Sequence, residues 1–162
     1  MNFIFFMPDE LRAESVGCYG HPLAPTPNMD ALAAAGTRFD QCHVQHSVCT
    51  PSRCSLLTGW YPHVRGHRTL WHMLRPDEPN LFRYLKSAGY AVHWYGKNDT
   101  LSPESFADSV DVAERRGSGM FGSNPYSLDD PAYYSFLYEP YTGPLEEHSD
   151  YANVQAGIDF FQ

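Results

Sequence analysis

The chain has 162 residues, a hydrophobic fraction of 43% and an aromatic fraction of 15%, which indicate a folded globular protein and exclude a disordered one. Its formal net charge is −8, and residues 101–162 hold eleven acidic but only two basic residues. This balance lacks the basic stripe of a nucleic-acid-binding protein, and no apolar run reaches the length of a membrane-spanning helix, so neither nucleic acid nor membrane is expected as a partner.

The chain opens on an apolar run, residues 3–7, which has the length of a strand and ends at Pro8. A continuous run of this kind is typical of a strand that is buried on both faces of a parallel sheet. Asp9 and Glu10 follow at the carboxyl end of this strand, where ligands collect in such sheets, so Asp9 is a candidate ligand for a hard metal ion. The alternative is that Asp9 only caps the next turn. Because the run lacks the basic start and the cleavage site of a signal peptide, a cytoplasmic location is expected.

Further elements follow in alternation. Thr26 and Pro27 predict the start of a helix that ends at Gly36, and residues 37–48 contain strand-like side chains. Helices are predicted at about 51–58 and between Pro79 and Gly89, and a strand at 90–95. This order favours an α/β fold with a mostly parallel sheet flanked by helices.

The periodicity weakens after residue 100. Residues 101–148 are expected to be a loop-rich insertion, because a long stretch without clear elements in a compact domain is usually a functional loop or an insertion. A helix is predicted over 149–162, with Val154, Ile158 and Phe161 on one face. Four tyrosines are candidates for lining a substrate pocket, with simple packing as the alternative: Tyr133, Tyr134, Tyr138 and Tyr141.

The most reactive stretch is residues 49–59, which read C-T-P-S-R-C-S-L-L-T-G. Thr50 is the expected N-cap, Pro51 suits the first helical position, and Gly59 is a natural end. Cys49 would then lie at the positive end of a helix dipole, where backbone N–H groups favour a bound anion. Arg53 adds a cation whose forked donors suit tetrahedral oxyanions. The stretch therefore predicts a site for a sulfate or phosphate ester.

The pattern C-T-P-S-R-x-x-x-x-T-G resembles the signature of the type I sulfatases, whose cysteine is oxidised after translation to formylglycine. Other parts of the chain resemble the same family in the expected order: residues 9–10, 17–20, 26–33, 61–63 and 85–97. The resemblance covers about residues 1–100 and implies the alkaline-phosphatase-like α/β fold. It also implies that residues 1–162 are the N-terminal portion of a sulfatase catalytic domain, incomplete at the C-terminus. Within it, residues 1–100 would form the nucleophile-bearing core.

The resemblance implies roles for particular residues. Cys49, matured by a formylglycine-generating enzyme, would provide the nucleophile that cleaves a sulfate ester of a small molecule or glycan. Arg53 and Lys97 would be catalytic, and Lys97 would also bind the substrate sulfate. Asp9, Glu10 and the matured Cys49 would bind a divalent metal ion, Ca²⁺ in first place and Mg²⁺ in second.

The chain departs from the family pattern at three points. Glu10 stands where aspartate is commoner, and Asp99 stands where the family often has a histidine two residues after the lysine. The later Asp and Asn or His metal ligands have no match here. The 162-residue chain by itself is therefore expected to have little or no sulfatase activity.

Other functions stay open at this stage. The same apparatus suits phosphate or phosphonate esters, and Cys49 with a histidine base would make a cysteine hydrolase. A non-catalytic relic that pairs with another chain is a further alternative. A zinc-binding module is the non-enzymatic alternative, because thiolates and imidazoles lie close together in the sequence. Its candidate ligands are Cys42, His43, His46, Cys49 and Cys54.

Overall fold

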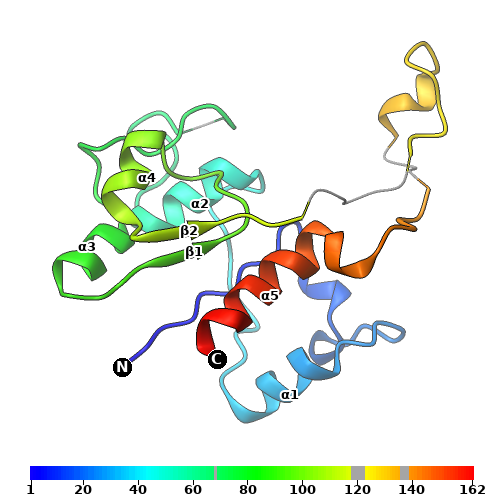
Figure 1. The fold of residues 1–162 in the computed structure, drawn as a ribbon, viewed down its shortest axis with the longest axis horizontal. Coiled ribbons are helices and arrows are strands. Elements are labelled where there is room, and N and C mark those ends of the chain that lie inside the picture. Colours follow the sequence, from blue (N-terminus) through cyan, green and yellow to red (C-terminus); the bar gives the residue numbers. More distant parts are fainter. Residues whose placement is uncertain (68, 118–122, 136–138) are drawn as a thin grey trace. The chain divides into compact units, whose positions relative to one another are not determined.

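A computed structural model describes residues 1–67, 69–117, 123–135 and 139–162 (Figure 1). The chain divides into two compact units, Met1–Met73 and Leu74–Gln162. Among the described residues, no helix is both long and apolar enough to cross a bilayer. The two units are described in turn.

The first unit contains two α-helices, α1 (Pro27–Ala35) and α2 (Cys49–Thr58), and two 3-10 turns, η1 (Ala13–Ser15) and η2 (Gly17–Tyr19). Helix α1 begins with Pro27 in its first turn and is followed by Gly36, as the sequence predicts. The η2 turn packs on α1, because the Cys18 N–H donates to the Asp30 carboxylate (2.6 Å). A charge in the first turn of α1 thus fixes the preceding loop.

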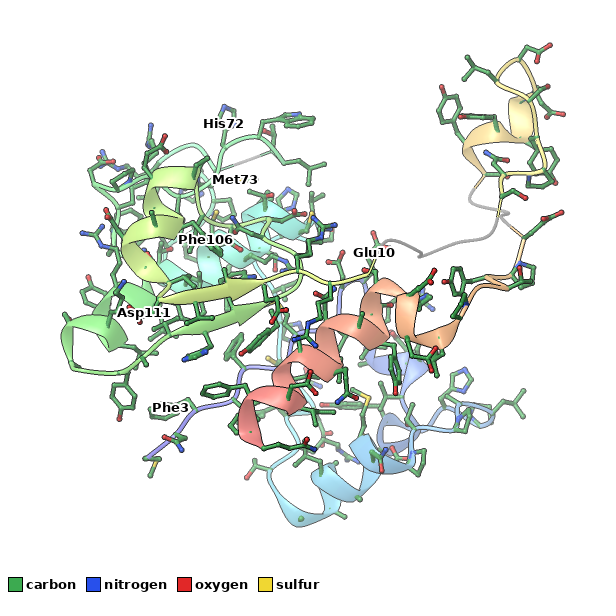
Figure 2. All side chains as sticks on the ribbon, in the orientation of Figure 1. Phe3, Glu10, His72, Met73, Phe106 and Asp111 are labelled. Atoms are coloured by element: carbon green, nitrogen blue, oxygen red, sulfur yellow. The ribbon has the colours of Figure 1, made fainter. Side chains whose placement is uncertain are left out.

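The prediction of a buried first strand over residues 3–7 was wrong. These residues adopt no strand, and their side chains are exposed, from 38% at Met7 to 74% at Ile4; Phe3 is labelled in Figure 2. A strand exists only where a neighbour takes its backbone hydrogen bonds. In the described parts of the chain, strand pairing is confined to other residues, so the apolar run stays extended without a sheet. The strand-like residues 37–48 likewise form no strand.

The second unit is built around a parallel pair of short strands. Strand β1 (His93–Tyr95) pairs with β2 (Val112–Glu114), with His93 opposite Val112 and Tyr95 opposite Glu114. Helix α4 (Pro103–Ser109) lies between them in the sequence, so β1, α4 and β2 form a βαβ unit. The parallel sheet flanked by helices confirms the predicted α/β class. The remaining helices are α3 (Leu81–Ser87), η3 (Pro131–Tyr134), η4 (Leu145–Glu147) and α5 (Ser149–Phe161).

Side-chain caps explain where α3 and α4 begin. The Asn80 side chain accepts a hydrogen bond from the Arg83 N–H (3.0 Å), and the Ser102 hydroxyl accepts one from the Ser105 N–H (3.2 Å). Each cap satisfies a backbone donor that has no partner inside the helix. The segment 101–148, expected to be loop-rich, therefore holds α4 and β2 in its first part.

Helix α5 forms where the sequence predicts it but buries the opposite face. Its buried residues are Ala152 and Ala156, whereas the predicted apolar face is exposed, with Ile158 at 44% and Phe161 at 61%. Helix α5 contacts β1, and a Cβ added at Gly157 would lie 3.7 Å from the Tyr95 ring. Small side chains thus allow the helix to approach the strand closely, which overrides the periodicity of the larger ones.

Candidate active site

Helix α2 carries the predicted nucleophile in its first turn. The helix begins at Cys49 itself, with Val48 as its N-cap, and the Ser52 N–H donates to the Val48 carbonyl (3.1 Å). The prediction that Thr50 is the N-cap and Pro51 the first residue was therefore wrong by two positions. A proline anywhere in the first turn sacrifices no intrahelical hydrogen bond, so Pro51 did not fix the start. Cys49 is half-buried at the positive end of the helix dipole.

The Thr50 side chain connects α2 to a distant loop instead of capping the helix. Thr50 is fully buried, and its hydroxyl donates to the carbonyl of Leu70 (3.2 Å). The residue next to Cys49 is thereby joined to a segment twenty positions later. At the other end, Gly59 adopts a left-handed conformation (φ 73°) and its N–H donates to Ser55 (2.8 Å), as the predicted helix end requires.

Arg53 and Asp9 form an ion pair inside the first unit. The Arg53 Nη2 donates to Asp9 Oδ1 over 3.0 Å, and the two side chains are 9% and 39% exposed. Helix α2 holds Arg53 on its buried side, one turn after Cys49. The structure therefore brings together two of the residues that the sequence singles out, one from α2 and one from the extended N-terminal segment.

The acidic pair at 9–10 offers oxygen ligands but does not complete a metal site by itself. Glu10 is exposed and has a left-handed backbone (φ 56°), which is uncommon for a residue with a side chain. Among the described residues, no group of three or more His, Cys, Asp or Glu side chains could hold a metal ion. Asp9, Glu10 and Cys49 thus do not form such a group, although the carboxylate oxygens of Asp9 and Glu10 suit calcium or magnesium. The same finding counts against zinc at Cys42, His43, His46, Cys49 and Cys54.

Lys97 lies in the second unit, directly after β1. Gly96 has a left-handed conformation (φ 94°), which turns the chain between Tyr95 and Lys97. The Lys97 ammonium forms an ion pair with Asp99 (Nζ to Oδ2, 2.9 Å), and the side chains are 42% and 23% exposed. Asp99 therefore neutralises the charge of the Lys97 ammonium. The structure joins Lys97 to Asp99 and Arg53 to Asp9, each pair inside its own unit.

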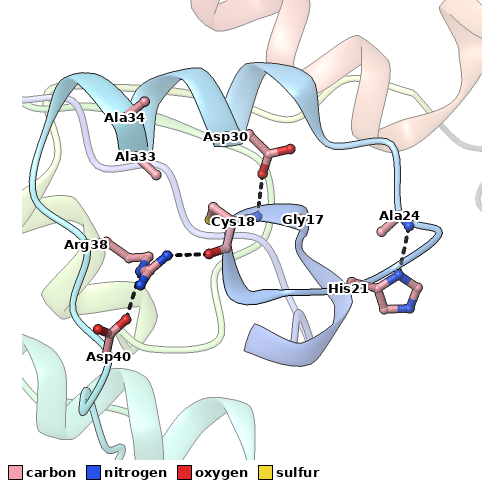
Figure 3. A pocket seen from close by; sticks show the side chains of 9 residues that line it. All are labelled: Gly17, Cys18, His21, Ala24, Asp30, Ala33, Ala34, Arg38 and Asp40. Carbon is pink, nitrogen blue, oxygen red and sulfur yellow. Dashed lines mark hydrogen bonds and ion pairs between the residues drawn. The ribbon is translucent and has the colours of Figure 1, made fainter.

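A pocket of about 660 Å³ lies beside α1, and Figure 3 shows its polar groups bonded to one another. The Arg38 guanidinium donates to the Asp40 carboxylate (2.7 Å) and to the Cys18 carbonyl (2.5 Å), and Asp40 raises the pKa of Arg38. These contacts indicate that the side chains around the pocket hold residues 17–20 in place. The residues that line the pocket do not include Cys49, Arg53 or Asp9. They are Gly17, Cys18, His21, Ala24, Asp30, Ala33, Ala34, Arg38 and Asp40.

The candidate tyrosines are not part of the pocket beside α1. Tyr133 and Tyr134 pack edge to face in η3 (ring centroids 4.9 Å apart), and Tyr134 is 73% exposed. The Tyr141 hydroxyl donates to the Pro144 carbonyl (3.1 Å). Tyr138 lies outside the described residues. Packing and local hydrogen bonds therefore account for the three that are described.

Comparison with known proteins supports what residues 49–59 indicate. A family model described as Sulfatase matches residues 1–161. The chain belongs to the sulfatase family. It is 51% identical to human arylsulfatase A over 141 residues, which are 79% of this chain and 26% of that protein. It is 36% identical to an N-acetylglucosamine-6-O-sulfatase of Bacteroides thetaiotaomicron over 106 residues, which are 65% of this chain and 19% of that protein.

Solved structures agree with the sulfatase assignment. The chain resembles a protein solved in complex with its substrate D-glucosamine-2-N,6-O-disulfate, with a TM-score of 0.59 and 36% identity over 62% of this chain and 20% of that one. A second structure, from Bacteroides thetaiotaomicron, has a TM-score of 0.61 at 24% identity and supports the fold. This sulfatase chain thus spans less than a third of the length of these relatives. Sulfatases generally use a formylglycine and a divalent metal ion.

Sequence reasoning missed two contacts of this sulfatase chain. The pairing of Asp99 with Lys97 had a signal, because oppositely charged residues two positions apart after a strand can meet across a turn. The tether from Thr50 to Leu70 had none, because a hydroxyl bond to a backbone carbonyl leaves no pattern in side-chain types.

Proposed function

We propose that this chain supplies the nucleophile, Cys49, of a sulfate-ester hydrolase. The observation that carries the proposal is the first turn of α2, where Cys49 starts the helix and Arg53 follows one turn later, fixed by Asp9. A helix start and a buried guanidinium both favour a tetrahedral anion, and sulfate is such an anion.

The residues of the chain would share the work as follows. The backbone N–H groups at the start of α2 would donate hydrogen bonds to the sulfate oxygens and orient the sulfur toward residue 49. Arg53, already held by Asp9, would stabilise the developing negative charge without reorganising during the reaction. Lys97 is proposed as a further sulfate-binding residue, once its ammonium releases Asp99. The formylglycine, once formed from Cys49, supplies a hydrated aldehyde as the nucleophile.

A calcium or magnesium ion is proposed as the metal, with Asp9 and Glu10 as two of its oxygen ligands. Calcium takes six to eight oxygens in total, roughly, so further ligands have to come from other residues. The described residues do not complete the metal site by themselves.

A sulfate ester of a small molecule or glycan is the proposed substrate. The related proteins support this class through their names, since one is an arylsulfatase and another a sulfatase of N-acetylglucosamine. A phosphate or phosphonate ester is the alternative, because Arg53 would hold any tetrahedral oxyanion.

The maturation of Cys49 tests the proposal most directly. The chain is co-expressed with a formylglycine-generating enzyme, and the peptide that contains residue 49 is analysed by mass spectrometry. We expect conversion of the thiol to an aldehyde in the parent chain and in Cys54→Ala, whose altered cysteine lies on the same helix. Cys49→Ala should show no aldehyde. A thiol that stays unchanged at Cys49 under these conditions would contradict the proposal.

A further inference from the structure

Trp71 presents a large apolar side chain next to the segment that is tied to the nucleophile. Its side chain is 85% exposed, and the preceding residue, Leu70, accepts the hydrogen bond from the Thr50 hydroxyl (3.2 Å). Thr50 in turn is the neighbour of Cys49. A single hydrogen bond, from Thr50 to Leu70, therefore links the residue next to Cys49 with the residue next to Trp71.

The backbone around Trp71 is held by further hydrogen bonds. The Trp71 N–H donates to the Thr69 hydroxyl (3.3 Å), and that hydroxyl also bonds to His72 Nδ1 (3.0 Å). The His72 carbonyl bonds to Nδ1 of His67, whose side chain is buried (Figure 2 labels His72). Three successive residues, 70, 71 and 72, are thus fixed at their main chain. These bonds fix the main chain that carries Trp71, while the indole itself projects into water.

We propose that Trp71 is a substrate-specificity residue that packs on the ring of the alcohol part of the sulfate ester. The inference rests on the proposed function, because it takes residue 49 as the place where the sulfate binds. When the sulfate lies at the start of α2, the alcohol that carries it extends away from the helix. The Trp71 main chain follows Leu70, which is bonded to Thr50, and its exposed indole offers a flat apolar face that stacks on an aromatic ring or on the C–H face of a sugar ring.

We expect this site to bind ring-bearing sulfate esters more tightly than short open-chain ones. Residues 67–73 contain no acidic side chain, so the loop does not repel a ring that carries further sulfate groups. Stacking of one ring on another contributes a factor of about three to ten in affinity. That factor is the expected preference of this site.

Binding to the full 162-residue chain tests the inference, with three probes of known structure. 4-Nitrophenyl sulfate carries an aromatic ring, glucosamine-6-sulfate carries a sugar ring, and methyl sulfate carries no ring. NMR titration gives the dissociation constants. The indole N–H signal of Trp71 is assigned as the one that disappears in Trp71→Phe. We expect a ring probe to shift that signal and methyl sulfate to leave it in place.

Substitutions then measure the contribution of the indole. Trp71→Ala should weaken a ring probe by about threefold to tenfold and leave methyl sulfate unchanged, whereas Trp71→Tyr should retain most of the affinity. Leu23→Ala is the matched control, because Leu23 is 86% exposed on another loop of the same unit, and it should change neither constant. Which ring probe responds distinguishes an aromatic substrate from a sugar.

The outcomes separate this inference from the proposed function. If substitution of Arg53 weakens the binding of the ring probes but Trp71→Ala leaves their affinity unchanged, the role of Trp71 is refuted and the proposed function stands. If Trp71→Ala weakens methyl sulfate as much as the ring probes, Trp71 acts on the fold and the inference fails. If no probe depends on Arg53, both proposals fail.

Discussion

Two cations of this chain, Arg53 and Lys97, are candidates for holding sulfate, and both are bonded to an aspartate. The Arg53 side chain is 9% exposed and bonded to a residue 44 positions away in the sequence. The Lys97 side chain is 42% exposed and bonded to a residue two positions away in the same turn. The first pair connects distant segments of its unit, whereas the second is a local contact on the surface.

This difference indicates different work for the two cations. A buried pair loses much when it is broken, because the remaining charge has neither water nor a partner. A half-exposed pair exchanges its partner at little cost, because water solvates both groups. Arg53 is therefore suited to a fixed framework around the proposed nucleophile, and Lys97 to its proposed role as a group that releases Asp99 and binds substrate.

The largest effect is expected at Arg53. Arg53→Met should lower the free energy of unfolding by about 2 kcal/mol, less than the roughly 3 to 5 kcal/mol of a fully buried pair, because Asp9 is partly exposed to water. Arg53→Lys should lose less, since it keeps the charge but not the planar donor fork. Urea denaturation of the two variants and the parent chain measures the difference.

Two controls sharpen the Arg53 experiment. Arg12→Met removes a cation of the same unit whose side chain is 77% exposed, and it should change stability by less than about 0.5 kcal/mol. Asp9→Asn combined with Arg53→Met should cost less than the sum of the two single changes, because both remove the same contact. Equal losses at Arg12 and Arg53 would refute the distinction between buried framework and exposed surface.

The sequence predicts the local features of both regions better than their long-range contacts. The start of α1 at Pro27, the end of α2 at Gly59 and the position of α5 depend on residues that act within one turn, and these predictions were confirmed. Helix α4 was missed although Ser102 and Pro103 carry the usual signal of a helix start. The loop-like composition of the segment as a whole hides this local signal, which consists of only two residues.

Contacts between distant segments were beyond the sequence for physical reasons. The apolar run at 3–7 has the composition of a strand, but composition does not reveal whether a neighbouring strand is there to pair with it. The motif at 49–59 indicates the nucleophile and the arginine, yet it does not show that Asp9 binds Arg53. Residue types thus predicted the members of the candidate site, and only the structure shows which of them meet.

An intermediate effect is expected at Asp99. Asp99→Asn removes the anion that neutralises Lys97, so the chain should bind inorganic sulfate about twofold to fivefold more tightly, with a change in stability below about 0.5 kcal/mol. The shift of the Lys97 side-chain NMR signal during sulfate titration measures the affinity. Asp108→Asn makes the same change in net charge at an exposed position of α4 and should leave that affinity unchanged. If both variants bind sulfate equally well, Lys97 responds only to net charge and has no local role.

The smallest effect is expected at Asp111, which supports the strand that leads to Lys97. Its carboxylate accepts a hydrogen bond from the Val92 N–H (2.8 Å) and forms an ion pair with Lys86 (3.0 Å), and these contacts lower the pKa of Asp111 below its ordinary value of 3.8. Because the folded chain holds this carboxylate ionised, its contribution is present above pH 3.8 and is lost as the pH falls through the lowered pKa. In Asp111→Asn the amide oxygen still accepts from Val92, but the ion pair is gone. This variant should therefore be slightly less stable near neutral pH and should lose less on acidification from about pH 5 to about pH 2, as thermal unfolding at each pH measures. If Asp111→Asn and the parent chain lose the same stability on acidification, the ion pair of Asp111 with Lys86 contributes nothing to the strand that leads to Lys97. The difference between the two cations would then depend only on their own aspartate partners.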